Sequence, residues 1–239
     1  MGVISEDEMK VYLDNNIIID IENGRYILPK EYNVEFPYSY VHIEELIESG
    51  VRLSELKTIR LNTLSCVSNN EYIFQDNQKL YFIDKSPKEV YNWFSPIIME
   101  LKRIIKEKVN KFDLEENLKA KLQIDKNITN NLTISQFIEK YGNIVLGYLD
   151  ESSDTLQENF QSFFNILNGL GYWSDKKRNG TNINRVYDAN HAFYASSCDY
   201  FVTNDKKAMM KANFIYSYYG IKTKSISFDE FLNILSSNK

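Results

Sequence analysis

The stretch RVYDANHAFYASSCDYFVTND, residues 185–205, decides the fold of this chain. Its apolar run DYFVT predicts a strand, with one helix expected to open at Asp188 before it and another to open at Asp205 after it. The segments IKTKSIS at 221–227 and FDEFLNIL at 228–235 then repeat the order of strand and helix. Such alternation is typical of an α/β domain in which part of the sheet is parallel.

Two further strands are predicted in the N-terminal part of the chain. KVYL at 10–13 is a short apolar run that ends at Asp14. YNVEFPYS at 32–39 forms a second run, in which Pro37 comes late enough for a strand end to tolerate it. The segment EYIFQDNQKLYFID at 71–84 predicts a hairpin around the turn residues DNQ.

A long middle part of the chain follows a helical pattern. Apolar residues recur at helical spacing from Pro87 to about Gly171, with a break expected at Pro96. The segment WSDKKRNGTNIN at 173–184 is polar and rich in turn residues, so we expect a connection there.

The 239 residues suit one large domain, or a core domain that carries a sizeable insertion. We expect the core at residues 10–60 and 184–239, with a central, mainly parallel sheet flanked by helices. An inserted helical subdomain is expected at approximately 61–183, together with the hairpin. Trp93 and Trp173 are expected to be packing anchors within this insertion.

Composition excludes several classes of protein. With 43% hydrophobic and 26% charged residues, the chain has the make-up of an ordinary globular domain. No apolar run approaches the roughly 18 residues of a membrane span, and the acidic start MGVISEDEMK is unlike a secretory signal. Two cysteines without a CxxC pair argue against a disulfide framework or structural zinc site, so we expect a cytoplasmic protein.

The net charge of −5 is unevenly distributed along the chain. Residues 1–100 carry 17 Asp and Glu against 9 Lys and Arg, whereas residues 101–239 carry 16 against 19. Basic clusters stand at 102–111 (KRIIKEKVNK) and at 176–178 (KKR). Each cluster fits either the solvated face of a surface helix or a contact with phosphates.

Four acidic side chains are candidates for one shared site. Asp14 and Asp205 follow predicted strands. Asp188 opens a predicted helix, and Glu45 lies on the helix expected after the second strand. If the strands before Asp14 and Asp205 are neighbours, both side chains point into the crevice at the carboxyl ends of a parallel sheet. Taken singly, each aspartate is also explained as a turn or N-cap residue, and Glu45 as a solvated one.

Carboxylates that meet in one pocket need a cation. Two of them about 4 Å apart repel by roughly 4 kcal/mol at an effective dielectric of about 20. Several together therefore require a bound cation, or some must be protonated. Oxygen ligands without Cys or His favour Mg²⁺ or Mn²⁺. Such ions activate water and clamp the oxygens of a phosphodiester, so the pattern predicts phosphodiester hydrolysis.

The motifs around these acids resemble those of the PIN-domain (PilT N-terminus) nuclease family. The strand that ends in an acid is VYLDNNII, with Asp14, and the helix-borne glutamate is Glu45 in YSYVHIEELI. The last two acids stand in YDANHAFYA, with Asp188, and in CDYFVTND, with Asp205. The resemblance implies a PIN-like fold, and the long interval between Glu45 and Asp188 departs from compact members of the family.

Two details of the resemblance concern neighbouring residues. Thr203 matches the hydroxyl residue that the family has beside its last acid, and the resemblance implies that it orients an acid or water. Glu44 precedes Glu45 and remains an alternative ligand. Glu45 is favoured because Leu46 follows it, as Leu or Ile follows the glutamate of the family.

The resemblance implies a Mg²⁺- or Mn²⁺-dependent endonuclease that hydrolyses RNA rather than DNA, leaving a 5′-phosphate and a 3′-hydroxyl. Asp14, Glu45, Asp188 and Asp205 would bind the metal, with Thr203 assisting. Toxins of toxin–antitoxin pairs and phage-defence effectors are common in the family. An antitoxin or other regulatory partner, or a second copy in a homodimer, is therefore conceivable, and no membrane is expected. The alternative is an inactive PIN-like binding or scaffold module whose partner surface is the helical insertion.

Other polar and aromatic side chains allow two interpretations. His191 either contacts a phosphate or packs in the fold. The aromatic run FIYSYYG at 214–220 either stacks on bases or belongs to the core. Asp20 and Asp199 are secondary acids, expected in turns or behind the metal ligands.

Overall fold

The chain, described here as a computed structural model, divides into two compact units. The first comprises Met1–Ile98, Tyr194–Asn204 and Thr223–Lys239, and the second comprises Met99–Phe193 and Asp205–Lys222. The structure describes residues 8–29, 33–48, 54–97, 129–150, 155–175 and 181–237. The basic clusters at 102–111 and 176–178 lie outside the described residues.

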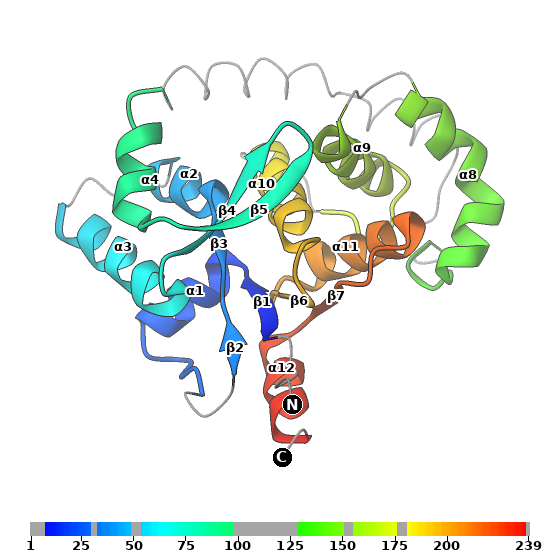
Figure 1. Cartoon of the computed structure of the whole chain (residues 1–239). Helices are drawn as coiled ribbons and strands as arrows, with labels where there is room; N and C mark the ends of the chain where they lie inside the picture. The colour runs from blue at the N-terminus through cyan, green and yellow to red at the C-terminus, as the bar shows by residue number, and fades with distance from the viewer. Residues whose placement is uncertain are drawn as a thin grey trace, which may run out of the picture. The chain divides into compact units, whose positions relative to one another are not determined.

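A four-stranded parallel sheet forms the centre of the first unit (Figure 1). Its strand order is β2-β1-β6-β7, and every pair of neighbours is parallel. The strands are β1 Met9–Leu13, β2 Val34–Glu35, β6 Tyr200–Val202 and β7 Lys224–Ile226. Because helices flank this sheet, the chain is a mixed α/β protein, as the alternation of strands and helices predicted.

Continuous burial explains why β1 and β6 form the middle of the sheet. Val11, Tyr12 and Leu13 are buried one after another, and so are Phe201 and Val202 on β6. A strand that is covered on both faces needs apolar residues at successive positions. The pairing sets Leu13 opposite Val202, so the residues that follow these two strands are neighbours.

Pro37 divides the run that the sequence predicted as one second strand. β2 joins the parallel sheet beside β1, whereas β3, Tyr38–Ser39, pairs with β4 in another sheet. Proline has no N–H to donate to a strand ladder, and its ring fixes φ near about −65°. The segment 32–39 therefore contains two short strands that belong to two sheets.

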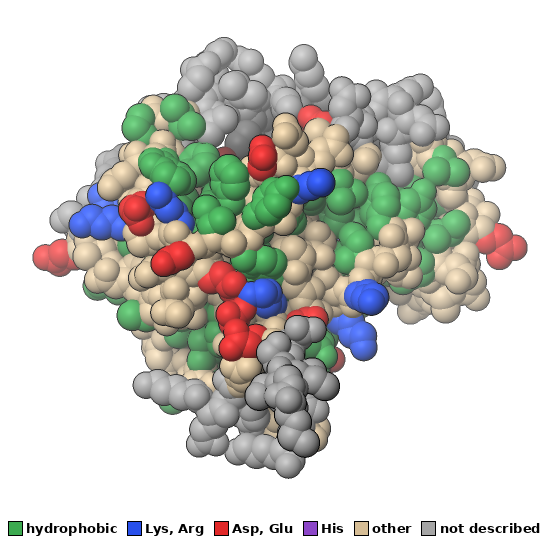
Figure 2. Space-filling model, in the orientation of Figure 1, with side chains coloured by type: hydrophobic (Ala, Val, Ile, Leu, Met, Phe, Trp, Pro, Cys, Tyr) green, Lys and Arg blue, Asp and Glu red, His purple; other side chains and the backbone are tan. Residues whose placement is uncertain are grey.

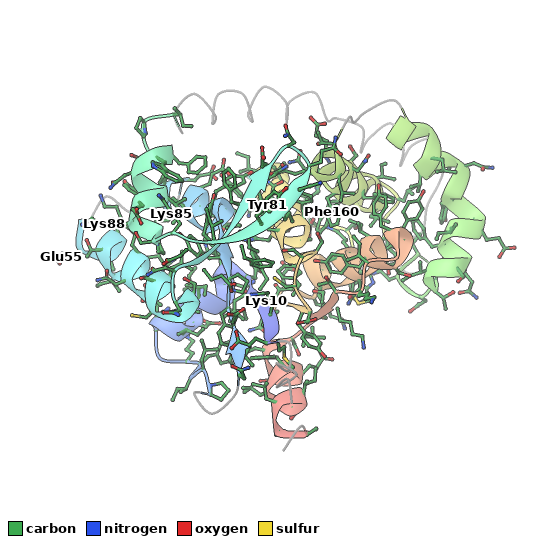
Figure 3. The ribbon with its side chains drawn as sticks, in the orientation of Figure 1. Lys10, Glu55, Tyr81, Lys85, Lys88 and Phe160 are labelled. Atoms are coloured by element: carbon green, nitrogen blue, oxygen red, sulfur yellow. The ribbon has the colours of Figure 1, made fainter. Side chains whose placement is uncertain are left out.

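The predicted hairpin is present. β4, Glu71–Asp76, pairs antiparallel with β5, Lys79–Asp84, and Asn77 has a positive φ of 53° in the turn between them. Because β4 also pairs with β3, the hairpin folds in the first unit, although the sequence placed it in the insertion. Its outer face exposes Phe74 and Tyr81, and apolar side chains are visible on this side of the molecule (Figures 2 and 3).

Five named helices of the first unit pack on the sheet or beside it. They are α1 Asn15–Glu22, α2 Tyr40–Glu48, α3 Ser54–Ser68, α4 Pro87–Phe94 and α12 Phe228–Ser237. A capping box between Ser86 and Glu89 starts α4, which ends before Pro96, where the sequence predicted a break. Their buried apolar residues join Leu13 and Val202 in one hydrophobic core.

Aromatic side chains form the core of the second unit. Its helices are α8 Ile134–Asp150, α9 Leu156–Gly169, α11 Lys206–Tyr219 and most of α10 Thr181–Ala195. Phe214 packs against Phe137, and Tyr219 stacks on Phe160 of α9. Phe214 and Tyr216 are fully buried, so this part of the aromatic run belongs to the core rather than to a base-stacking surface.

The helix that was predicted to open at Asp188 begins earlier, at Thr181. Asn182 and Asn184 are weak helix formers, which is why the sequence indicated a connection there. The side chains of Arg185 and Tyr187 are buried, and this packing outweighs the local preference. Asp188 therefore lies within α10 and is not its N-cap.

Substitutions at two glycines of the second unit test whether the left-handed backbone at the end of α11 requires glycine. Gly220 ends α11 with φ at 66°, in the left-handed region, whereas Gly147 lies inside α8. A Cβ at either position would meet no atom within 4 Å, so the backbone conformation alone decides the effect. We expect Gly220→Ala to lower the free energy of unfolding by about 1 kcal/mol, and Gly147→Ala to raise it by up to about 1 kcal/mol. Denaturant titration measures both, and shifts of the same sign would contradict the expectation.

Candidate functional site

The candidate site lies where the order of strands in the parallel sheet reverses direction. From β1 the chain continues to β2 on one side, while β6 lies on the other side of β1 and continues to β7. In open α/β sheets, ligands bind at such a point, outside the carboxyl ends of the strands. Asp14 and Thr203 directly follow β1 and β6. The backbone N–H of Asp14 donates to Val202 O (2.9 Å), and that of Thr203 donates to Ile226 O (3.0 Å).

The Asp14 carboxylate is held on both of its oxygen atoms. Oδ2 accepts hydrogen bonds from Thr203 Oγ1 and from Asn16 Nδ2, each 2.6 Å long. Oδ1 accepts from the backbone N–H of Asn15 (2.7 Å), and the side chain is the N-cap of α1. The interpretation of Asp14 as a cap is therefore correct, but the cap uses Oδ1 only. Oδ2 is bonded across the sheet to the residue after β6.

A buried oxygen atom beside Asp14 has no hydrogen-bond donor. Asn16 Nδ2 donates to Asp14 Oδ2 and also approaches Thr203 Oγ1 at 3.2 Å. Asn16 Oδ1 is buried and has no hydrogen-bond partner within the described part of the chain. Leaving a buried polar atom unsatisfied costs about 1–3 kcal/mol. A ligand donor or a cation at this oxygen would remove that cost, and the sequence analysis did not single out Asn16.

Glu45 lies on α2, and hydrogen bonds through Asn15 connect it to Asp14. Asn15 Nδ2 donates to Glu45 Oε2, while the Asn15 backbone N–H donates to Asp14. The neighbouring Glu44 is buried, and its charge adds to the effect of burial in raising the pKa of Tyr194. Asn15 thus connects Glu45 to the Asp14 carboxylate.

His42 is a buried residue that sequence reasoning missed. Its Nε2 lies 2.8 Å from Leu13 O, which can only accept, so Nε2 carries the proton and donates. Nδ1 then accepts from the backbone N–H of Ser39 (3.2 Å), and Tyr12 OH bonds Ser39 Oγ at 2.6 Å. These bonds tie the start of α2 to the end of β1. The signal was a histidine three residues before Glu45 on the apolar face of its helix.

The two remaining predicted acids belong to the second unit. Asp205 is the N-cap of α11: its Oδ1 accepts from the backbone N–H groups of Lys207 (2.8 Å) and Ala208 (3.1 Å). Asp188 lies within α10 and acts electrostatically on Lys211. Among the described residues, no three His, Cys, Asp or Glu side chains are grouped so that they could hold a metal ion. The shared site of four acids stays a prediction.

Three cations surround Asp175 in the second unit, and we call this group the Asp175 cluster. Lys211 Nζ donates to Asp175 Oδ2 (2.8 Å), Arg185 Nε lies 3.6 Å from the same oxygen, and Lys207 Nζ lies 3.5 Å from Oδ1. Burial raises the pKa of Asp175, but the three positive charges outweigh it and hold the pKa below its ordinary value. Burial lowers the pKa of Lys211, and the carboxylates of Asp175 and Asp188 oppose that shift.

The secondary acids have structural contacts. Asp199 precedes β6, at the amino end of the strands, and its Oδ2 accepts from the backbone N–H of Lys10 (2.9 Å). Asp20 accepts from Arg25 Nη1 (2.8 Å) near the end of α1. Asp199 lies in a bend, as expected of a turn residue, whereas Asp20 lies within α1.

His191 is packed in the fold, as one of its two interpretations predicted, whereas Trp93 is not buried as expected. His191 is 1% exposed, which matches the packed interpretation and leaves its side chain out of reach of a phosphate in solution. Trp93 is 51% exposed, with Lys85 Nζ 4.0 Å from its ring centroid. The expectation that Trp93 is a packing anchor is wrong, because α4 turns this ring outward.

No protein-family model, curated protein or solved structure matches this chain. Of the helices that the structure describes, none has the length and apolar character needed to cross a bilayer.

The Asp175 cluster predicts a pH dependence of stability. The pKa of Asp175 is lower in the folded chain, so its ion pairs stabilise the fold above the ordinary carboxyl pKa. That contribution disappears as the pH falls. We expect the free energy of unfolding of wild type to fall more steeply than that of Asp175→Asn between about pH 5 and pH 3. Urea titrations across this range measure the two slopes, and parallel slopes would contradict the assignment.

Proposed function

We propose that this protein is a divalent-metal-dependent endonuclease that hydrolyses phosphodiester bonds of RNA. The observation that carries the proposal is the Asp14 carboxylate at the carboxyl edge of the parallel sheet. Thr203 holds one of its oxygens across the sheet, and Asn16 Oδ1 lies beside it, buried and without a donor among the described residues. The resemblance of the motifs to PIN-domain nucleases adds the reaction class and the preference for RNA.

The oxygen atoms around Asp14 fit a hard divalent cation. Carboxylate and amide oxygens are ligands that Mg²⁺ and Mn²⁺ prefer. We assign Asp14 and Asn16 as ligands, and Glu45 as a further acid of the first unit. Asp188 and Asp205 stay ligands predicted from the resemblance. When bound, such an ion lowers the pKa of a coordinated water and stabilises charge that develops on the phosphate.

Neighbouring side chains of the protein hold Asp14 in position. Thr203 and Asn16 both donate to Asp14 Oδ2, so the plane of the carboxylate is fixed before any ligand arrives. His42 Nε2 donates to Leu13 O and fixes the backbone just before Asp14. A side chain held in this way loses little orientational freedom when it binds, which lowers the barrier of the reaction.

Asp14→Asn tests the site, with Asp20→Asn as the matched control. Both substitutions replace an aspartate of the first unit by its amide, but Asp20 binds only Arg25 among the contacts described above. With labelled single-stranded RNA and Mn²⁺, we expect Asp14→Asn to lower the cleavage rate by about 10²-fold or more. Asp20→Asn should cleave like wild type. Equal rates for both variants would remove Asp14 from the site, and no cleavage by wild type would favour the scaffold alternative.

Thr203 provides a second test, because two substitutions separate its hydroxyl from its shape. Thr203→Val keeps the shape but removes the donor to Asp14 Oδ2, whereas Thr203→Ser keeps the donor. We expect Thr203→Val to lower kcat by roughly 10-fold or more with little change in KM for RNA. Thr203→Ser should stay near wild type. If the two variants have the same kcat, the hydroxyl has no positioning role.

A further inference from the structure

The Asp175 cluster brings several cations to one place in the second unit. Lys211, Arg185 and Lys207 all lie within 3.6 Å of Asp175. The cluster holds three cations around one carboxylate, and Asp188 adds a second negative charge that acts on Lys211. A fixed surplus of positive charge attracts phosphate groups.

The three cations differ in how far they reach solvent. The side chain of Lys211 is 1% exposed and that of Arg185 is 6% exposed, whereas that of Lys207 is 37% exposed. Lys207 Nζ is 3.5 Å from Asp175 Oδ1, which is beyond the usual length of an N–H···O hydrogen bond. The inner cations hold Asp175, and Lys207 is the one that reaches a ligand in solution.

An indole N–H without an acceptor lies close to Asp175 in the chain. Trp173 Nε1 is buried and has no hydrogen-bond partner among the residues described. Lys206 Nζ lies 4.9 Å from the centroid of the Trp173 ring, and the Lys206 side chain is exposed. An unsatisfied buried donor is costly, and an anionic oxygen that reaches it would remove that cost.

The backbone around Trp173 is held in place before a ligand binds. Asn130 Oδ1 accepts from the Trp173 N–H (2.6 Å), and Asn168 Oδ1 accepts from the Asp175 N–H (2.7 Å). Trp173 itself has a φ of 45°, a conformation that is unfavourable for a residue other than glycine. These two amide contacts fix the backbone at Trp173 and Asp175, and Lys211 of α11 binds the Asp175 carboxylate.

We propose that Lys206, Lys207 and Trp173 bind a backbone phosphate of the RNA strand. This inference rests on the proposed nuclease function. The two ammonium groups supply charge-assisted hydrogen bonds to phosphate oxygens, and the indole N–H supplies a third donor. Asp205 caps the same helix, so the surplus of positive charge is small. A small surplus favours a strand that is bound through several contacts over a single free anion.

Binding is measured without cleavage in the Asp14→Asn background, with EDTA and a fluorescein-labelled single-stranded RNA of about 12 nucleotides. Fluorescence anisotropy between about 50 and 200 mM KCl yields the Kd and its salt dependence. We expect Lys206→Gln and Lys207→Gln each to raise Kd by roughly 10-fold and to reduce the slope of log K against log salt by about 0.7. Lys140→Gln on α8 is the matched control, because Lys140 is exposed and lies 5.2 Å from the Tyr141 ring centroid.

Trp173 reports on the same site by its own fluorescence. The chain has two tryptophans, so Trp93→Phe leaves Trp173 as the single emitter. RNA should change this emission in the Trp93→Phe protein, and inorganic phosphate at the same phosphate concentration should change it far less. Trp173→Phe keeps a ring but removes the N–H, and we expect it to weaken RNA binding several-fold while the melting temperature stays near that of wild type.

The outcomes separate this site from the nuclease proposal. Equal Kd values and salt slopes for Lys206→Gln, Lys207→Gln and Lys140→Gln would overturn the phosphate site, whatever the cleavage results. A full response of Trp173 to inorganic phosphate alone would overturn the assignment to a strand. If wild type cleaves no RNA but the two lysine variants still bind it more weakly, the phosphate site stands and the nuclease proposal fails.

Discussion

The parallel pairing of β1 with β6 is the constraint on which the rest of the first unit depends. It joins segments far apart in the sequence and sets Leu13 opposite Val202. The next residue of each strand, Asp14 and Thr203, then meets the other at a hydrogen bond of 2.6 Å. A register shifted by one residue would move Thr203 away from Asp14 and break this hydrogen bond, so the strand pairing and the candidate site are specified together.

Aspartates at the two ends of this sheet have different surroundings and different roles. Asp199 stands at the amino end, where its carboxylate accepts from a backbone N–H of β1 and serves the pairing of strands. Asp14 stands at the carboxyl end, where a hydroxyl and an amide hold its carboxylate beside an oxygen that has no donor in the part of the chain that the structure describes. The difference follows from the direction of parallel strands, because the crevice of such a sheet lies at their carboxyl ends.

The second unit combines an aromatic core with buried charge. Phe137, Phe160 and Phe214 fill the space between its helices, which leaves little freedom for α11 to shift. On this helix, Lys211 is completely buried and is stabilised by Asp175, whereas Lys206 and Lys207 lie at the exposed N-terminal end. Removing one partner of such a buried pair is strongly destabilising. Lys207 lies farther from Asp175 than Lys211 does, and its side chain is more exposed.

Local patterns in the sequence determined the elements that depend on nearby residues: the strands ending at Asp14 and near Thr203, the cap at Asp205, the hairpin at 71–84 and the break at Pro96. They predicted the mainly parallel sheet, because alternating strands and helices leave few other arrangements. Only the tertiary structure decided what depends on distant partners. Packing of Arg185 starts α10 before Asp188, pairing with β3 brings the hairpin into the first unit, and burial gives His42 and Asn16 their roles. The physical reason is that helix caps and hydrophobic periodicity depend on adjacent residues. Strand pairing and desolvation depend instead on chain segments that are far apart in the sequence.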